Sequence, residues 1–393
     1  MAITPSAAGR RAEIVGGGIS GLTAATALAQ RGWSVRLHER NERIRAFGAG
    51  IYVWGNGLRA LRALGRYEQA VAGAHVGPVL ETRDHRDRPV ERLPINDPGR
   101  PEVLTVLRER LIGALVDGAV EAGVEIAAGS EVVVADPDGT IRTASGEEAR
   151  ADLVVVADGV NSRLRDRLGL LSSRARVGQG ATRLTVPRAE GYVAAGDADK
   201  YLEFFAGRRR VLYTPSSADE LYVALVADED DAAGRRVPVD VDAWVRSFPH
   251  LERLLRACAG VDGRWDAFEF LTLRAWSRGR VAVTGDAAHA QPPYLGQGGA
   301  CAMMGALGLA DALSREGAGG IEERLAAWEE RERPLIEHTQ QWSYRLRLLN
   351  RVPDAPRSSL LSLAGRCRTF GTSRLRAAMA VPTGAEPVAG SAA

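Results

Sequence analysis

The sequence predicts an α/β protein in which a parallel sheet flanked by helices carries an inserted, mostly antiparallel sheet and is followed by C-terminal helices. Three short apolar runs, at residues 12–15, 153–156 and 281–283, have the composition of buried parallel strands, and a glycine or aspartate motif follows each one. Residues 176–274 instead alternate apolar and polar positions between Pro, Ser, Gly and Asp breaks, which is typical of antiparallel strands. Parallel sheets of this kind bind ligands beyond the carboxyl ends of their strands, where the three motifs lie.

The first motif has the features of a dinucleotide-binding turn. Gly16, Gly18 and Gly21 follow the first strand, and residues 20–31 form an Ala/Leu-rich helix. The first glycine permits a tight turn, the second lets a pyrophosphate approach the backbone, and the third allows the helix to pack closely on the strand. The pyrophosphate then lies at the helix N-terminus, where free N–H groups favour an anion. Glu39 follows Gly21 by 18 residues, close to the spacing expected of a carboxylate that binds ribose hydroxyls.

The second and third motifs each place an aspartate directly after a buried strand. They are Asp158-Gly159, and Gly285-Asp286 followed by Ala-Ala-His289. An acid followed by small residues that open a helix can bind hydroxyl groups without crowding a ligand. An aspartate in this position is also a common helix N-cap, so each motif alone supports either role. The fixed order of the three motifs favours one long dinucleotide held at several points, and we predict FAD in a Rossmann-like domain of the glutathione-reductase type. We predict a structural role for His289.

This domain is expected to be discontinuous in the sequence. The predicted ranges are 11–75, 101–175 and 275–345 for the FAD-binding domain, 76–100 and 176–274 for a substrate domain, and 346–393 for a C-terminal helix and a disordered tail. Helices are expected at 108–122, 300–316 and 321–349, and strands of the inserted sheet at 201–206, 210–214, 221–227 and 265–273.

The composition is that of a soluble globular enzyme. The chain has 393 residues, of which 45% are hydrophobic and 25% charged, and its net charge of +2 gives no basic face for nucleic acid. Its three cysteines are far apart and form no CxxC pair, so we expect neither disulfides nor zinc and infer a cytoplasmic location. We predict no metal site, and no apolar run is long enough to cross a membrane.

The ordered motifs resemble those of the single-component FAD-dependent aromatic monooxygenases, the p-hydroxybenzoate hydroxylase family, over residues 11–345. Local phrases look most like the branch that oxygenates a hydroxypyridine carboxylate and opens its ring; these phrases lie at 35–39, 45–52, 56–59 and 301–303.

The resemblance implies a set of cofactor-binding residues along the chain. The ADP half would be held by Gly16, Gly18, Ile19, Ser20, Gly21, Glu39 and Arg40. Arg45 and Arg108 would reach FAD, Asp158 and Gly159 would form the second fingerprint, shared with NAD(P)H, and Gly285 and Asp286 the third, with its carboxylate on the ribityl chain. A loop and helix start beneath the flavin ring would be formed by Pro293, Gly296, Gly298 and Gly299.

The implied reaction uses FAD with NADH or NADPH as co-substrate and O2. A flavin C(4a)-hydroperoxide would transfer oxygen to a small electron-rich aromatic or a hydroxypyridine carboxylate, with or without ring opening. The chain has no second glycine fingerprint, so NAD(P)H is expected to dock transiently. The expected partners are the aromatic substrate and O2, without nucleic acid or membrane, and the expected assembly is a monomer or homodimer.

The candidate substrate residues come from the inserted sheet. Arg210 and Tyr222 lie on consecutive strands and match substrate-contacting positions of the hydroxypyridine branch, where they would hold a carboxylate. Alternatively, Arg210 belongs to the solvated run 208–210 and Tyr222 packs within the sheet. Tyr52 is a further candidate near the flavin. Leu80 departs from the tyrosine that the resemblance leads us to expect, which leaves a less polar pocket wall.

Other functions of the same fold stay open at this point. They are hydroxylation of a phenol or an antibiotic intermediate without ring opening, a non-oxygenating FAD-dependent reductase or oxidase, and an FAD-binding module without activity. A flavin halogenase is disfavoured, because the seven tryptophans show no Trp-x-Trp spacing.

Overall fold

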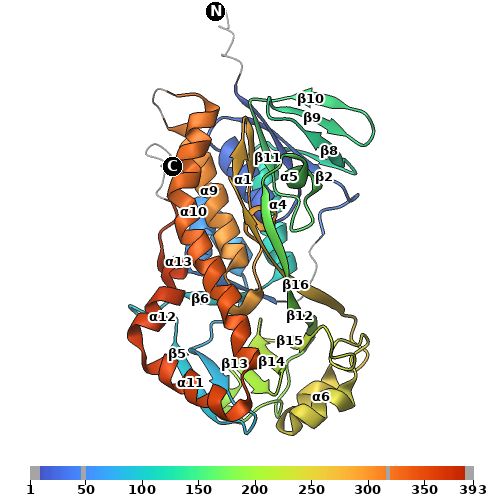
Figure 1. Ribbon diagram of the computed structural model, residues 1–393, viewed down its shortest axis with the longest axis vertical. Helices are drawn as coiled ribbons and strands as arrows, with labels where there is room; N and C mark the ends of the chain where they lie inside the picture. The colour runs from blue at the N-terminus through green and yellow to red at the C-terminus, as the bar shows by residue number, and fades with distance from the viewer. Residues whose placement is uncertain (1–8, 46–49, 316–318, 386–393) are drawn as a thin grey trace, which may run out of the picture.

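The computed structural model describes residues 9–45, 50–315 and 319–385. A six-stranded sheet forms the upper half of the molecule in Figure 1, in the order β17-β18-β11-β1-β2-β7. Its strands are parallel except for the edge strand β17. Strands β11 and β18 are wholly buried because helices cover the sheet, which explains their uninterrupted apolar sequences. The bounds are Arg11–Val15 (β1), Ser34–Glu39 (β2), Glu125–Ala128 (β7), Leu153–Val156 (β11), Ser277–Arg278 (β17) and Val281–Val283 (β18).

Helices pack against this sheet and against each other. The helix after the glycine turn, α1, contacts α4 and α9, and α10 lies along α9 (Figure 1). The indole N–H of Trp328 on α10 donates to the carbonyl oxygen of Gly305 on α9, 2.9 Å away. The bounds are Ile19–Ala29 (α1), Gly55–Ala63 (α2), Tyr67–Val71 (α3), Arg108–Glu121 (α4), Arg163–Arg167 (α5), Asp286–His289 (α8), Gly298–Ser314 (α9) and Ile321–Leu346 (α10).

Two smaller sheets complete the upper half. Strands β8, β9 and β10 form a meander at its edge, and β3 pairs with β6 between the two halves. Their bounds are Gly50–Trp54 (β3), Val103–Leu107 (β6), Val132–Ala135 (β8), Thr140–Thr143 (β9) and Glu148–Arg150 (β10).

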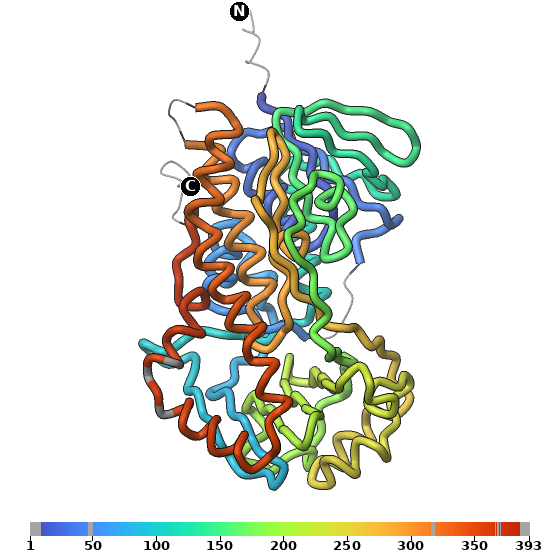
Figure 2. Tube along the Cα trace, in the orientation of Figure 1, coloured from blue at the N-terminus to red at the C-terminus, as the bar shows by residue number. Residues whose placement is uncertain are grey.

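The lower half contains a seven-stranded sheet in the order β16-β12-β15-β14-β13-β4-β5, antiparallel except for the β13–β4 pair. The long strands β12 and β16 run from the upper half into the lower half (Figure 2). Trp244, Phe248 and Leu254 from the helical segment 241–257 cover one face of this sheet, and the other face points toward the FAD-binding half. The bounds are Val79–Arg83 (β4), Pro89–Pro94 (β5), Leu171–Pro187 (β12), Tyr201–Ala206 (β13), Arg209–Pro215 (β14), Glu220–Asp228 (β15), Arg264–Leu273 (β16), Val241–Ser247 (α6) and Glu252–Ala257 (α7).

The predicted fold class is confirmed, and the four strands expected in the inserted sheet are present as β13, β14, β15 and β16. The end of the chain differs from the prediction of a single helix. Three further short helices follow α10, namely Asp354–Arg366 (α11), Arg368–Arg374 (α12) and Arg376–Met379 (α13). Helices this short depend on packing, here of α11 on β5 and of α13 on α2, and packing is not visible in sequence periodicity.

The disordered tail predicted within residues 346–393 also needs correction in its first part. Arg59 on α2 donates to the carbonyl oxygen of Ala380 at 3.2 Å, and Arg31, in the turn after α1, donates to that of Gly384 at 3.3 Å, so these hydrogen bonds hold residues 380 and 384 against the FAD-binding half. The remainder of the predicted tail, residues 386–393, lies outside the described residues, as do residues 1–8, 46–49 and 316–318.

The glycine turn allows a close backbone packing on which the position of α1 depends. A Cβ atom at Gly21 would overlap the carbonyl oxygen of Gly16. Gly113 on α4 is a matched control, because a Cβ atom there would meet nothing within 4 Å.

Gly21→Ala is expected to destabilise the apoprotein by about 1–3 kcal/mol, since the turn or the helix must shift to admit the methyl group. Gly113→Ala should keep or raise the melting temperature, because alanine is favoured over glycine inside a helix by about 1 kcal/mol. Thermal unfolding followed by circular dichroism measures both variants. Equal melting temperatures for Gly21→Ala and the wild type would contradict the packing argument.

Candidate functional site

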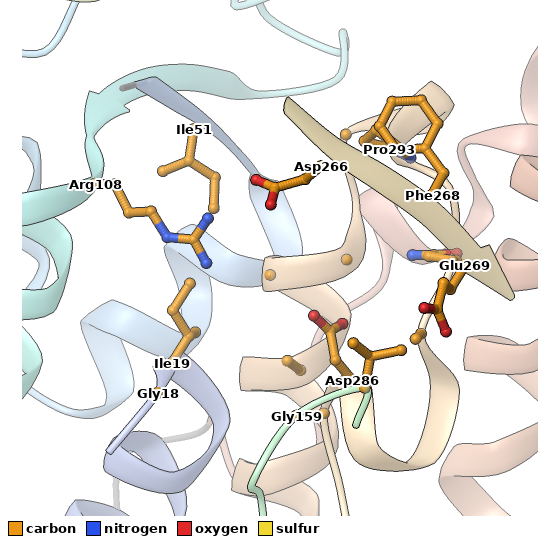
Figure 3. A pocket seen from close by; sticks show the side chains of 18 of the residues that line it. Gly18, Ile19, Ile51, Arg108, Gly159, Asp266, Phe268, Glu269, Asp286 and Pro293 are labelled. Carbon is orange, nitrogen blue, oxygen red and sulfur yellow. The ribbon is translucent and has the colours of Figure 1, made fainter. Parts of the chain in front are cut away.

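A cavity of about 1180 Å³ lies between the carboxyl ends of the parallel strands and the open face of the seven-stranded sheet. Figure 3 shows part of it, with Arg108 and Ile51 on one side, Asp286 and Gly159 below, and Asp266 and Phe268 on the sheet above. Both halves of the molecule therefore contribute to its wall. Its position matches the crevice at which open α/β sheets bind ligands.

The first glycine motif forms a cradle at one end of this cavity. Gly16 has a φ of +107°, and a Cβ atom there would overlap the backbone of Ala157 at the end of β11. A Cβ atom at Gly18 would meet no protein atom within 4 Å, so a side chain would project into the cavity. The first helical hydrogen bond of α1 runs from Leu22 N to Gly18 O, which leaves the preceding N–H groups without helical acceptors. This geometry suits a phosphate group.

Glu39 is held beside the cradle by backbone donors. Its Oε2 accepts from Gly17 N and its Oε1 from Asn41 N, both at 3.0 Å. Oε1 also accepts from the side-chain Nδ2 of Asn41 at 2.5 Å. A carboxylate has about four acceptor positions, so about one is left for a hydroxyl group of a ligand. Arg40 lines the cavity next to it.

The second motif contains an acceptor without a partner. Oδ1 of Asp158 is buried and has no hydrogen-bond partner among the described residues, and burial raises the pKa of this carboxyl group. The adjacent Gly159 has a φ of +88°, and a Cβ atom there would meet nothing within 4 Å. Buried polar atoms are almost always satisfied, so an orphaned oxygen next to open space indicates a place for a polar ligand group.

Asp286 and Arg108 point into the cavity from opposite sides (Figure 3). Asp286 begins α8; it is crowded by protein atoms, yet its side chain is exposed to the cavity. Burial raises the pKa of its carboxyl group, and the nearby Arg108 partly opposes that shift. Burial lowers the pKa of Arg108, whose guanidinium forms no hydrogen bond or ion pair with the described residues. The two side chains are thus available to a ligand.

The N-terminus of α9 and the loop before it form another part of the cavity wall. Pro293, Gly296, Gly298 and Gly299 lie on the wall, and Gly296 has a φ of +61°. The first helical hydrogen bond runs from Cys301 N to Gln297 O at 2.9 Å, so the earlier N–H groups face the cavity region unpaired within the helix. The positive end of a 17-residue helix stabilises negative charge on a group placed there.

The site fits a dinucleotide, because it combines a glycine cradle, an orphaned aspartate oxygen, an unpaired arginine and two helix N-termini.

In sequence comparison, residues 11–343 match a family described as FAD binding domain. The chain is 51% identical over 365 residues to a 2-heptyl-3-hydroxy-4(1H)-quinolone synthase of Mycobacteroides abscessus, covering 93% of this chain and 97% of that protein. A putative 2-heptyl-3-hydroxy-4(1H)-quinolone synthase of Rhodococcus erythropolis is 50% identical over 95% of this chain and 97% of its own length.

A crystal structure of 2-methyl-3-hydroxypyridine-5-carboxylic acid oxygenase superposes with a TM-score of 0.86 at 39% identity, covering 95% of this chain and 98% of that one. The chain belongs to the FAD-dependent aromatic monooxygenases. Family membership confirms the predicted cofactor: the monooxygenase uses FAD, with NADH or NADPH as co-substrate. Bound FAD accepts a hydride from the nicotinamide and supplies activated oxygen from O2.

Most residues predicted to hold FAD line this one cavity. They are Gly16, Gly18, Ile19, Ser20, Glu39, Arg40, Arg108, Asp158, Gly159, Gly285, Asp286, Gly296, Gly298 and Gly299. Two others do not lie on its wall. Gly21 packs behind the turn, and Arg45 is exposed next to residues 46–49, which lie outside the described residues. Their contacts with FAD remain predictions.

The predicted substrate residues also line the cavity of the monooxygenase. Tyr52, Arg210 and Tyr222 lie on its wall, and Tyr52 OH is 2.9 Å from Thr214 Oγ1. The alternative that Arg210 is part of a solvated run is wrong, because its side chain is buried, whereas Arg208 and Arg209 pair with acidic residues of 228–231. The expectation of an arginine free to bind a carboxylate needs correction as well, since Arg210 is paired with Glu203.

Several residues of the cavity wall were missed from the sequence. Glu203, Asp266 and Phe268 are among them, together with Arg183, which lies 3.5 Å from Asp266. The sequence signal that could have found them is the alternation of side chains along a strand, because residues two apart lie on the same face of a sheet. That signal requires the strand register, which the sequence alone does not supply.

His289 lies outside the cavity wall, as its predicted structural role requires. Its ring lies 5.4 Å from the Trp276 ring, and burial lowers its pKa to about 4, so it is neutral near pH 7. Within the described ranges no group of His, Cys, Asp and Glu could hold a metal ion. No helix of the described part of the chain has the length and apolarity needed to cross a membrane.

Asp286→Ala is expected to weaken FAD binding to the apoprotein roughly 10- to 150-fold, because a hydrogen bond to a charged group contributes about 1.5–3 kcal/mol. Flavin content after purification and fluorescence titration of the apoprotein with FAD measure the effect. Asp117→Ala, at the exposed surface of α4, should bind FAD like the wild type. An unchanged FAD affinity of Asp286→Ala would exclude this aspartate as a cofactor ligand.

Proposed function

We propose that this monooxygenase hydroxylates carbon 3 of a 2-alkyl-4(1H)-quinolone. The observation that supports this substrate best is the apolar character of the cavity wall on the inserted-sheet side. Apolar and aromatic side chains form a continuous part of it, between charged residues of the same sheet: Leu80, Leu93, Tyr201, Leu212, Tyr222, Val226, Phe268 and Leu375. Two relatives about 50% identical to this chain are named for the synthesis of 2-heptyl-3-hydroxy-4(1H)-quinolone, which agrees with such a wall.

The chemistry of this substrate suits the reaction type. In a 4(1H)-quinolone the ring nitrogen donates electrons through the C2=C3 bond to the carbonyl group, so carbon 3 is electron-rich and can attack activated oxygen. The new C3–O bond replaces a C–H bond, and the departing proton restores the ring system. The protein has to hold carbon 3 toward the flavin end of the cavity and exclude water, and the apolar part of the wall contributes to both requirements.

An alkyl substituent gives the apolar wall an energetic role. Each buried methylene group contributes about 0.8 kcal/mol, so a chain of about seven carbons contributes several kcal/mol to binding. Leu80, where the resemblance leads us to expect a tyrosine, contributes carbon surface without a hydroxyl group that would lose its hydrogen bonds to water. A small aromatic carboxylate would use little of this wall.

We further infer that the enzyme acts in the cytoplasm as a monomer or homodimer. Support comes from the three free cysteines, which fit a reducing compartment. A solved relative with 40% identity is described as the tetrameric form of the pyridine oxygenase, so light scattering of the purified protein would decide the assembly.

The FAD-loaded enzyme is expected to consume NADH or NADPH with 2-heptyl-4(1H)-quinolone and to add one oxygen atom from ¹⁸O2 with the ring intact. Shortening the 2-substituent from heptyl to propyl to methyl should raise KM, by up to about fourfold per methylene group. Mass spectrometry of the product and initial rates of nicotinamide oxidation provide the measurement.

Hydroxybenzoate and hydroxypyridine carboxylates are the comparison substrates in that experiment. Efficient turnover of a hydroxypyridine carboxylate to an acyclic product would replace this proposal by ring opening. Phenol hydroxylation would replace it by simple ring hydroxylation. Nicotinamide oxidation without labelled product from any quinolone would indicate a reductase or oxidase.

A further inference from the structure

Arg210 occupies a defined position in the wall of the cavity. It lies on β14 with only 5% of its surface exposed, and its guanidinium carbon is 4.8 Å from the centroid of the Phe205 ring and 4.9 Å from that of Tyr294. Both distances are within the range of cation–π contacts, so two aromatic rings hold the guanidinium in place. A cation in this position would attract an anionic substrate unless another group balances its charge.

Glu203 supplies that balancing charge from the neighbouring strand. In the antiparallel register of β13 and β14, Phe205 is opposite Arg210 and Glu203 is opposite Leu212, so Glu203 and Arg210 are diagonal neighbours on one face. Their side chains form an ion pair, and both line the cavity. The pairing therefore belongs to the cavity wall and not to the outer surface.

A substrate carboxylate would meet an unfavourable environment here. The substrate carboxylate would have to displace the Glu203 carboxylate from Arg210 or lie beside that carboxylate. Two carboxylates side by side repel each other. A neutral heteroaromatic does not pay this electrostatic cost and still contacts the rings around Arg210. The arginine that the hydroxypyridine branch leads us to expect as a carboxylate ligand is therefore internally neutralised in this chain.

We propose that Glu203 is a specificity-determining residue that, by pairing with Arg210, makes the enzyme select uncharged heteroaromatic substrates over aromatic carboxylates. The inference rests on the proposed function in that it concerns the same site and explains why that site favours a neutral quinolone. The role of Glu203 concerns only the charge of the ligand, so dissociation constants measured without turnover can test it.

The test uses two ligands with the same bicyclic ring, 2-heptyl-4(1H)-quinolone as the neutral ligand and 4-hydroxyquinoline-2-carboxylate as the anion. Dissociation constants are measured by calorimetry with the FAD-loaded wild type, Glu203→Gln and the double variant Glu203→Gln/Arg210→Gln. Glu203→Gln should bind the carboxylate at least about tenfold more tightly than the wild type, because Arg210 becomes available to it. In the double variant this gain should disappear. The readout in Glu203→Gln is the ratio of the two dissociation constants, which should shift toward the carboxylate, because both ligands occupy the cavity that Glu203 lines.

The outcomes separate this inference from the proposed function. Carboxylate affinity that is unchanged in Glu203→Gln, or a gain that persists in the double variant, would overturn the role of Glu203 whatever the enzyme turns over. If the wild type does not oxygenate any quinolone but Glu203→Gln binds the carboxylate more tightly, the proposed substrate is wrong and the proposed role of Glu203 is supported. Glu203→Ala gives a second route to the same comparison if Glu203→Gln does not retain FAD. A wild type that binds the carboxylate as tightly as the neutral ligand would also overturn the inference.

Discussion

The site depends on the close approach of two backbone turns at the carboxyl ends of β1 and β11. Gly16 passes so near to Ala157 that a Cβ atom would overlap it, and Gly21 passes as closely over Gly16. This packing brings the N-terminus of α1, Asp158 and Gly159 to one end of the cavity. The third turn, at the end of β18, adds Asp286 because β18 pairs in parallel with β11. Sheet register thus places three separate sequence motifs around one cavity.

The inserted sheet forms the other wall, and its two faces have different roles. One face is apolar and packs against Trp244, Phe248 and Leu254. The other face borders the cavity, where apolar side chains are combined with arginines and carboxylates. Since a one-residue change in register would exchange the two faces, the packed helices on the far side fix which side chains the substrate meets.

Two arginines of the same cavity show how a fold assigns different roles to similar residues. Arg108 has no protein counter-ion in hydrogen-bonding contact among the described residues and faces the cofactor region, which suits a dinucleotide that brings its own negative charge. Arg210 is paired with Glu203 and stacked between aromatic rings, which suits a region that receives an uncharged substrate. An arginine that meets an anionic ligand needs no carboxylate of the protein beside it, whereas a buried arginine that meets a neutral ligand needs one to balance its charge.

The sequence by itself determined the fold class, the FAD-dependent monooxygenase family and the motifs that line the cofactor end of the cavity. It could do so because a strand, a glycine turn and a helix start are consecutive in the chain, and local backbone geometry follows from adjacent residues. Only the tertiary structure decided the partner of Arg210, the opposition of Arg108 and Asp286, and the packing of the short helices after α10. Those contacts join strands and helices that are distant in sequence, and their strand register and packing arise from burial across the whole sheet.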